Sequence, residues 1–165
     1  MKIPLCKICL KTGTYCQKCE STIAEGLVSP LDIKVLKILL DSKLVESIDK
    51  GVEYVKSINI GKRIVVLIRG NLNIEQTERM KNLLSRRLRS RVQIVIGSDD
   101  PEQLVRELYK PVRVLAVGRV HLPGDMKALR VTITSKDYRR WRRKIEDMTE
   151  LASRLTGYYI YVSQI

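Results

Sequence analysis

The sequence predicts an α+β fold in which an α-β-β-α-β unit occurs twice, preceded by a small cysteine-rich module. An apolar run at residues 64–68 is followed by a polar turn, a segment of helical period and a second apolar run at 92–96. The same order recurs at residues 129–162, which indicates an internal repeat. All four cysteines lie within the first 19 residues. We therefore expect three parts, at residues 1–28, 29–98 and 99–165.

The elements of the first unit carry clear start signals. Ser29 followed by Pro30 predicts a capped helix, because serine accepts from free amides and proline suits the first helical position. Asn73, with Gln76 three positions on, predicts a second capped helix. Gly61 predicts a hairpin turn between two strands. The expected order is helix 29–45, strands 53–60 and 63–69, helix 74–89 and strand 92–96.

The second unit repeats these signals. Asp100 before Pro101 predicts a helix start, Pro123-Gly124 a turn, Ser135 a helix cap and Gly157 a helix end. The expected order is helix 100–109, strands 112–122 and 128–134, helix 136–155 and strand 158–162.

The charge of the chain indicates which classes of binding partner it favours. The chain has 165 residues, a formal net charge of +13 and 44% apolar residues. Such a positive field favours polyanions: nucleic acid first, then anionic membrane surfaces, then an acidic protein. No apolar run approaches the roughly 18 residues that span a membrane, and no signal peptide follows Met1. We expect a cytoplasmic protein with no membrane and no small-molecule substrate.

The cysteines form two Cys-x-x-Cys pairs, Cys6 with Cys9 and Cys16 with Cys19. Each pair lets two sulfurs reach one metal from a single turn, and two pairs complete a tetrahedral shell that suits Zn²⁺. Iron in a rubredoxin-like shell is the alternative, whereas a redox pair would not need a second pair so close. We expect one structural zinc ion, held across a short hairpin, in a module that is unfolded without metal.

Basic side chains gather on two predicted helices. Each set could follow a phosphate backbone, although a solvated helix face is the plainer interpretation. The final helix also carries Tyr138 and Trp141 among its arginines, where aromatic rings could stack on bases. Both share one face with apolar residues further on, so Trp141 is expected in the core. The predicted RNA-binding residues are Arg79, Lys81, Arg86, Arg87 and Arg89 in the first unit and Arg139, Arg140, Arg142 and Arg143 in the second.

Catalytic patterns are missing from the sequence. The single histidine, His121, stands beside a predicted turn without a nucleophile or carboxylate motif around it. No glycine-rich phosphate loop occurs. We therefore expect the protein not to be an enzyme.

With these elements in place, the chain resembles archaeal NusA-like proteins. The resemblance is carried by the stretch Cys6–Gly13, the helix start Ser29–Asp32, the strand that ends at Arg69-Gly70, and Arg91–Val95. It implies tandem type II KH-like units, a zinc knuckle and a role in transcription elongation or termination. KH domains hold RNA with a Gly-x-x-Gly loop between two helices. Residues 71–79 and 136–140 contain no such loop, so no clamp residue is carried over from the family.

Three functions are compatible with this sequence. The leading hypothesis is an RNA-binding accessory factor of transcription that contacts RNA through basic helices and RNA polymerase through the knuckle or a sheet edge. The second is a protein-interaction adaptor with degenerate KH folds. The third is a ribosome-associated protein that binds ribosomal RNA.

Overall fold

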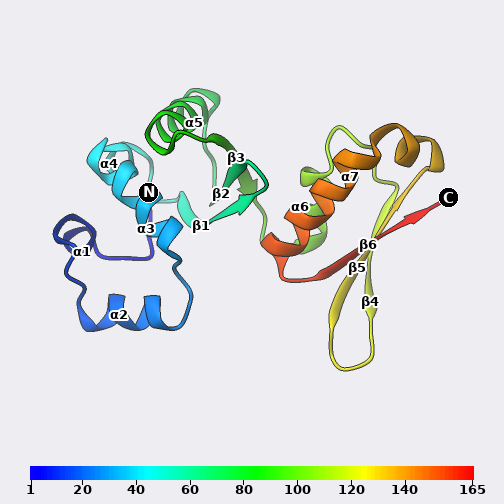
Figure 1. The fold of residues 1–165 in the computed structure, drawn as a ribbon, viewed down its shortest axis with the longest axis horizontal. Coiled ribbons are helices and arrows are strands. Elements are labelled where there is room, and N and C mark those ends of the chain that lie inside the picture. Colours follow the sequence, from blue (N-terminus) through cyan, green and yellow to red (C-terminus); the bar gives the residue numbers. More distant parts are fainter. The chain divides into compact units, whose positions relative to one another are not determined.

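The computed structural model describes residues 1–165 and divides them into two compact units, Met1–Gly97 and Ser98–Ile165. Each unit combines helices with one three-stranded mixed sheet (Figure 1). The predicted α+β class is thus confirmed. None of the helices has both the length and the apolar character that crossing a membrane requires.

Unit 1 begins with four helices, and their starts follow from local chemistry. In α3, Ser29 accepts from the amide of Asp32 and Asp32 accepts in return from the amide of Ser29, so the predicted cap forms a full capping box. The chain then breaks at Lys43, whose left-handed backbone (φ 61°) separates α3 from the short α4. The helices are α1 (Lys7–Thr12), α2 (Gln17–Ala24), α3 (Pro30–Asp41) and α4 (Leu44–Ser47).

The sheet of unit 1 has the order β1-β2-β3. β1 (Glu53–Ile60) and β2 (Arg63–Arg69) form the predicted antiparallel hairpin, and α5 (Ile74–Leu88) returns the chain to β3 (Arg91–Gly97), which pairs parallel with β2. The capping box predicted for Asn73 and Gln76 is confirmed, with both hydrogen bonds present.

A single core joins the cysteine-rich segment to the rest of unit 1. Leu5, Leu10 and Val28 are buried in the same cluster as Val35 and Leu39 of α3. The boundary at residue 28 stays a prediction, and the structure adds that the segments on either side of it share their interior.

A buried hydrogen-bond network fixes α3 against β1. Asp32, 3% exposed, accepts from the Tyr54 hydroxyl at 2.5 Å and from the Ser57 amide at 2.6 Å, while its other oxygen accepts from Ser29. A buried carboxylate needs such donors to replace its hydration. The network therefore fixes the orientation of α3 on the sheet.

Unit 2 repeats the order of unit 1. Its elements are α6 (Pro101–Leu108), β4 (Ala116–His121), β5 (Lys127–Ile133), α7 (Ser135–Thr156) and β6 (Tyr159–Gln164). The sheet order is β4-β5-β6, antiparallel and then parallel, as in the first sheet. Figure 1 shows α6 and α7 on one side of these strands. The predicted repeat of helix, strand, strand, helix and strand is therefore confirmed.

Several details differ from the sequence prediction. β4 begins at Ala116 and not at residue 112, because the buried Val112 donates its amide to the Tyr109 carbonyl and closes a turn after α6. Thr134, and not Ser135, caps α7 by accepting from the Asp137 amide. The predicted hairpin between the cysteine pairs was wrong, since two short helices occupy this region.

Candidate metal centre and basic surface

Each cysteine pair sits on the first turn of a helix. Cys6 and Cys16 are the residues that precede α1 and α2, and Cys9 and Cys19 lie three positions further on. On a helical first turn these two positions point to the same side, where free backbone amides also lie. Gly13, in a left-handed conformation (φ 74°), ends α1 and reverses the chain toward the second pair.

This arrangement brings the four thiols together. All four Sγ atoms lie within 4.8 Å of one another. A tetrahedral ion with metal–sulfur bonds of about 2.3 Å has sulfur atoms about 3.8 Å apart, so small side-chain movements suffice to bind one. Two amides point at sulfur, Cys6 N–H to Cys19 at 3.3 Å and Cys16 N–H to Cys9 at 3.4 Å. The residues therefore fit a metal ion with four sulfur ligands, and they would hold it in a closed shell.

The thiols differ in acidity. A hydrogen bond from the Cys19 backbone, helped by bonds with the other thiols, lowers the pKa of Cys16 to about 7. The Cys16 amide favours the thiolate of Cys9, but burial and the neighbouring thiols together raise the pKa of Cys9 above its usual value. The pKa of Cys19 is raised as well, despite an amide hydrogen bond from Cys6. A metal would displace protons from these thiols, so its affinity should rise with pH.

The metal centre is continuous with the core. Cys9 and Cys19 are 5% and 2% exposed and belong to the hydrophobic cluster, whereas Cys6 and Cys16 are exposed. Binding at the four sulfurs would hold both short helices against α3. The site is therefore linked to the stability of unit 1 more directly than a separate module would be.

The basic residues predicted on the first unit are all exposed. They lie on α5 or, for Arg89, at its C-terminal cap. Lys81 is 3.7 Å from Glu78, and the Arg86 side chain donates weakly to the Asn82 carbonyl. Exposed pairs of this kind contribute little, so the cations remain accessible to an anion.

The basic block of the second unit surrounds a kink. Trp141 has φ −116° and ψ 17°, which divides α7 into two helical parts. Its ring is half-buried, with the guanidinium of Arg140 5.3 Å and the ammonium of Lys144 5.2 Å from the ring centroid. Arg139, Arg142 and Arg143 are exposed beside it.

The expected apolar stripe on α7 is only partly formed. Ile145, Met148, Ala152 and Leu155 are buried as predicted, but Tyr138 and Trp141 are only half-buried because the kink turns them away from the stripe. Neither proline nor glycine occurs between Ser135 and Thr156, so no local sequence signal marks the kink.

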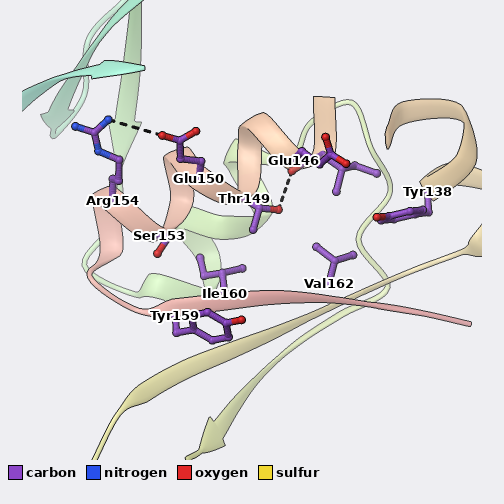
Figure 2. Close-up of a pocket in the computed structure, with 10 residues that line it drawn as sticks. Tyr138, Glu146, Thr149, Glu150, Ser153, Arg154, Tyr159, Ile160 and Val162 are labelled. Atoms are coloured by element: carbon purple, nitrogen blue, oxygen red, sulfur yellow. Dashed lines mark hydrogen bonds and ion pairs between the residues drawn. The ribbon is translucent and has the colours of Figure 1, made fainter. Parts of the chain in front are cut away.

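A groove between α7 and β6 was not predicted from the sequence. It measures about 530 Å³ and is lined by apolar side chains that include Ile145 of α7. Figure 2 shows Ile160 and Val162 of β6 pointing toward α7, where they form an apolar floor. Glu146 and Glu150 stand beside it on α7, and Tyr138 lies at the end near the basic block. Tyr159 borders the groove from the edge strand β6, with its ring on the side of the strand away from α7 (Figure 2). In the sequence, Tyr159 and Tyr161 alternate with Ile160 and Val162 in the last strand, and this alternation is a local signal for a strand with one apolar and one aromatic face.

The fold and the site together define a two-unit α+β protein with a cluster of four thiols that could hold a metal ion. No family model matches the chain, and no curated protein matches it either. Among solved structures, the chain is similar to the crystal structure of APE1850, with a TM-score of 0.58 and 17% sequence identity. The match covers 79% of this chain and 96% of that chain. At this identity the likeness concerns the fold alone.

Proposed function

We propose that this protein is a zinc-bearing RNA-binding accessory factor of transcription, similar to archaeal NusA-like proteins, with two KH-like units. The observation that carries the proposal is the exposed basic block around the kink in α7. A phosphate backbone requires several cations that are free of strong carboxylate pairs. Of the four arginines, only Arg142 forms an ion pair, a 3.3 Å contact with the exposed Glu146.

The topology supports a KH-like interpretation. Both units have the order helix, strand, strand, helix, strand, with the last two strands parallel. KH domains hold RNA with a Gly-x-x-Gly loop between two helices, and the kink at Trp141, which divides α7 into two helical parts, is the feature of unit 2 that would take the place of that loop. Cationic side chains would replace the glycine loop there, which makes binding dependent on salt and weakly selective.

The groove beside the basic block suits the base of a nucleotide and not its phosphate. Glu146 and Glu150 repel phosphate, but their carboxylates can accept from the amino groups of a base. Tyr138 and the apolar floor provide surface for a base. The phosphates would then follow the arginines while one base enters the groove.

Zinc is the metal that the donor set favours. Four sulfur ligands from two short turns match a structural zinc site, and a closed shell leaves no position for a reacting water. When bound, the ion would supply cross-linking of α1 and α2 and no catalysis.

The test measures RNA affinity across a salt series. Wild type and a variant with Arg139, Arg140, Arg142 and Arg143 changed to Ala are titrated with labelled single-stranded RNA. We expect wild type to bind with an affinity that falls as salt rises. In the variant, the plot of log affinity against log salt should be less steep by up to about 3, because each of the four lost phosphate contacts removes about 0.7 from the magnitude of the slope. No binding by wild type at about 0.15 M salt would refute the proposal.

A matched control removes the same charge elsewhere. Lys34, Lys50, Lys62 and Arg113 are exposed and lie outside both basic sets. Changing these four to Ala lowers the net charge equally, so a general charge effect would weaken binding as much as the arginine variant does. We expect this control to keep most of the wild-type slope.

One observation favours the adaptor as the second candidate. Ile8 is 74% exposed within the first cysteine pair, where an apolar side chain can contact a protein partner. If RNA binding is absent while partner proteins still co-purify, the adaptor function replaces the first proposal. RNA polymerase and the ribosome are the partners to look for.

A further inference from the structure

The sheet of unit 2 has one covered face and one open face. Leu129 and Val131 of β5 are fully buried toward the helices, as is Ile160 of β6 at 5% exposure. Side chains alternate along a strand, so Arg130 and Tyr161 point to the opposite face. The register places them side by side, since Arg130 pairs with Gly118 of β4 and with Tyr161 of β6.

Two tyrosines lie next to each other on this open face. Tyr159 is 59% exposed and Tyr161 is half-buried, and they are two positions apart on the edge strand, about 6.6 Å along it. Across the sheet, Gly118 leaves the surface flat, because a Cβ placed on it would have no atom within 4 Å. The face therefore offers flat aromatic surface with room above it.

The charge on this face is positive. Arg130 is exposed and has no ion pair. None of the strand residues on this face carries a carboxylate. Hydroxyl groups are present at Thr132 and Ser163, which the register pairs with each other. Aromatic rings with one cation and several hydroxyls match the base-stacking surfaces of proteins that bind single strands.

A protein partner fits this face less well. On β4 and β5 this face carries Ala116, Gly118 and Val120 opposite Thr132, Arg130 and Ala128, so it lacks the large apolar centre of a stable interface. The chain's net charge of +13 and the basic block on α7 of the same unit attract a polyanion to this unit.

We propose that the open face of the β4-β5-β6 sheet is a second nucleic-acid surface, on which Tyr159 and Tyr161 stack unpaired bases of a single strand while Arg130 holds the adjoining phosphate. This inference rests on the proposed RNA-binding function and adds a base-reading surface that the arginines of α7 do not provide. It makes the protein prefer single strands over duplexes, because paired bases cannot reach the tyrosines.

The test compares two oligonucleotides and two proteins. The probes are a uridine strand of about 12 nucleotides and an abasic strand of the same length, and the proteins are full-length wild type and the variant with Tyr159→Ala and Tyr161→Ala. We expect the variant to bind the uridine strand at least about 30-fold more weakly, since two stacked bases are lost, and the abasic strand as wild type does. The salt slope should stay unchanged, since no charge is removed.

Two further variants distinguish stacking from other effects. With Tyr159→Phe and Tyr161→Phe the rings remain, so affinity for the uridine strand should stay within about twofold of wild type. Arg130→Gln should lower the salt slope by about 0.7. Thermal unfolding followed by Trp141 fluorescence checks that unit 2 of each variant is folded.

The outcomes separate this proposal from the function on which it rests. If wild type binds both strands equally and the Ala variant binds like wild type, the stacking surface is refuted while phosphate binding by the basic helices stands. If the Phe variant loses as much affinity as the Ala variant, stacking is refuted and the hydroxyl groups matter. If wild type binds neither strand at about 0.15 M salt, both proposals fail.

Discussion

Removing the metal should destabilise unit 1 and leave unit 2 unchanged. Without a metal, the two cysteine turns are joined only by weak amide-to-sulfur hydrogen bonds and apolar contacts, so the segment that carries Leu5, Leu10 and Val28 can separate more easily from the core. Exposing three such side chains costs about 5–9 kcal/mol, which is an upper bound because the released segment regains conformational entropy. We take a net loss of about 3 kcal/mol in the free energy of unfolding of unit 1. For a unit of this size, such a loss lowers the midpoint of thermal unfolding by about 12–24 °C.

The assay uses the single tryptophan of the chain. Trp141 lies in α7, so its fluorescence reports the unfolding of unit 2, whereas far-UV circular dichroism reports both units. We expect a strong chelator to lower the midpoint temperature of only that part of the dichroism transition that belongs to unit 1. Added zinc should restore this midpoint. An unchanged dichroism curve after complete metal removal, confirmed by elemental analysis, would refute the link between the metal site and the core. An equal shift of the Trp141 transition would refute the independence of the two units.

Three further predictions concern the fold of unit 1. The pKa of Tyr54 is raised above its usual value by burial first and then by Asp32, so the unfolded chain loses this proton at lower pH than the folded one. The stabilisation contributed by Tyr54 is therefore present below about pH 10 and is lost as pH rises above it. In Tyr54→Phe, the free energy of unfolding measured in urea should fall less steeply with pH in that range. Asp32→Ala should cost about 3–5 kcal/mol in the same assay, because the buried donors that Asp32 satisfies lose their acceptor; a cost below about 1 kcal/mol would contradict this. Gly70→Ala should clearly lower the midpoint of thermal unfolding, since the φ of Gly70 is +107° and a Cβ there would lie 2.6 Å from the Gly51 carbonyl oxygen. The control Gly118→Ala should change the midpoint little, because no atom lies within 4 Å of a Cβ at that position. Equal midpoints for these two variants would contradict the geometry.

Much of the fold could be predicted because its signals are local. A helix cap such as Ser29 or Asn73 acts on amides two or three residues away, and a hairpin turn at Gly61 depends on the backbone of that residue. The grouping of the four cysteines was predicted for the same reason, since a Cys-x-x-Cys spacing places two sulfurs on one turn. The metal-binding potential of these thiols is confirmed by their separation, while RNA binding by the arginines stays a prediction.

The hairpin expected between the cysteine pairs shows where local signals were insufficient. The segment is too short to show a helical period, and its helices form where Leu10 and Cys19 can be buried against α3. The kink at Trp141 has no glycine or proline to announce it. The first of these outcomes depends on contacts between residues far apart in the chain.

The sequence by itself determined the α+β class, the repeated order of elements, the spacing that groups the four thiols and the excess of positive charge. Only the tertiary structure decided that Asp32 is buried among donors from β1, that the metal centre shares the core of unit 1, and that Tyr159 and Arg130 lie on one open sheet face. The physical reason is that caps, turns and periodicity act over a few residues, whereas burial and strand register are set by which distant segments pack together.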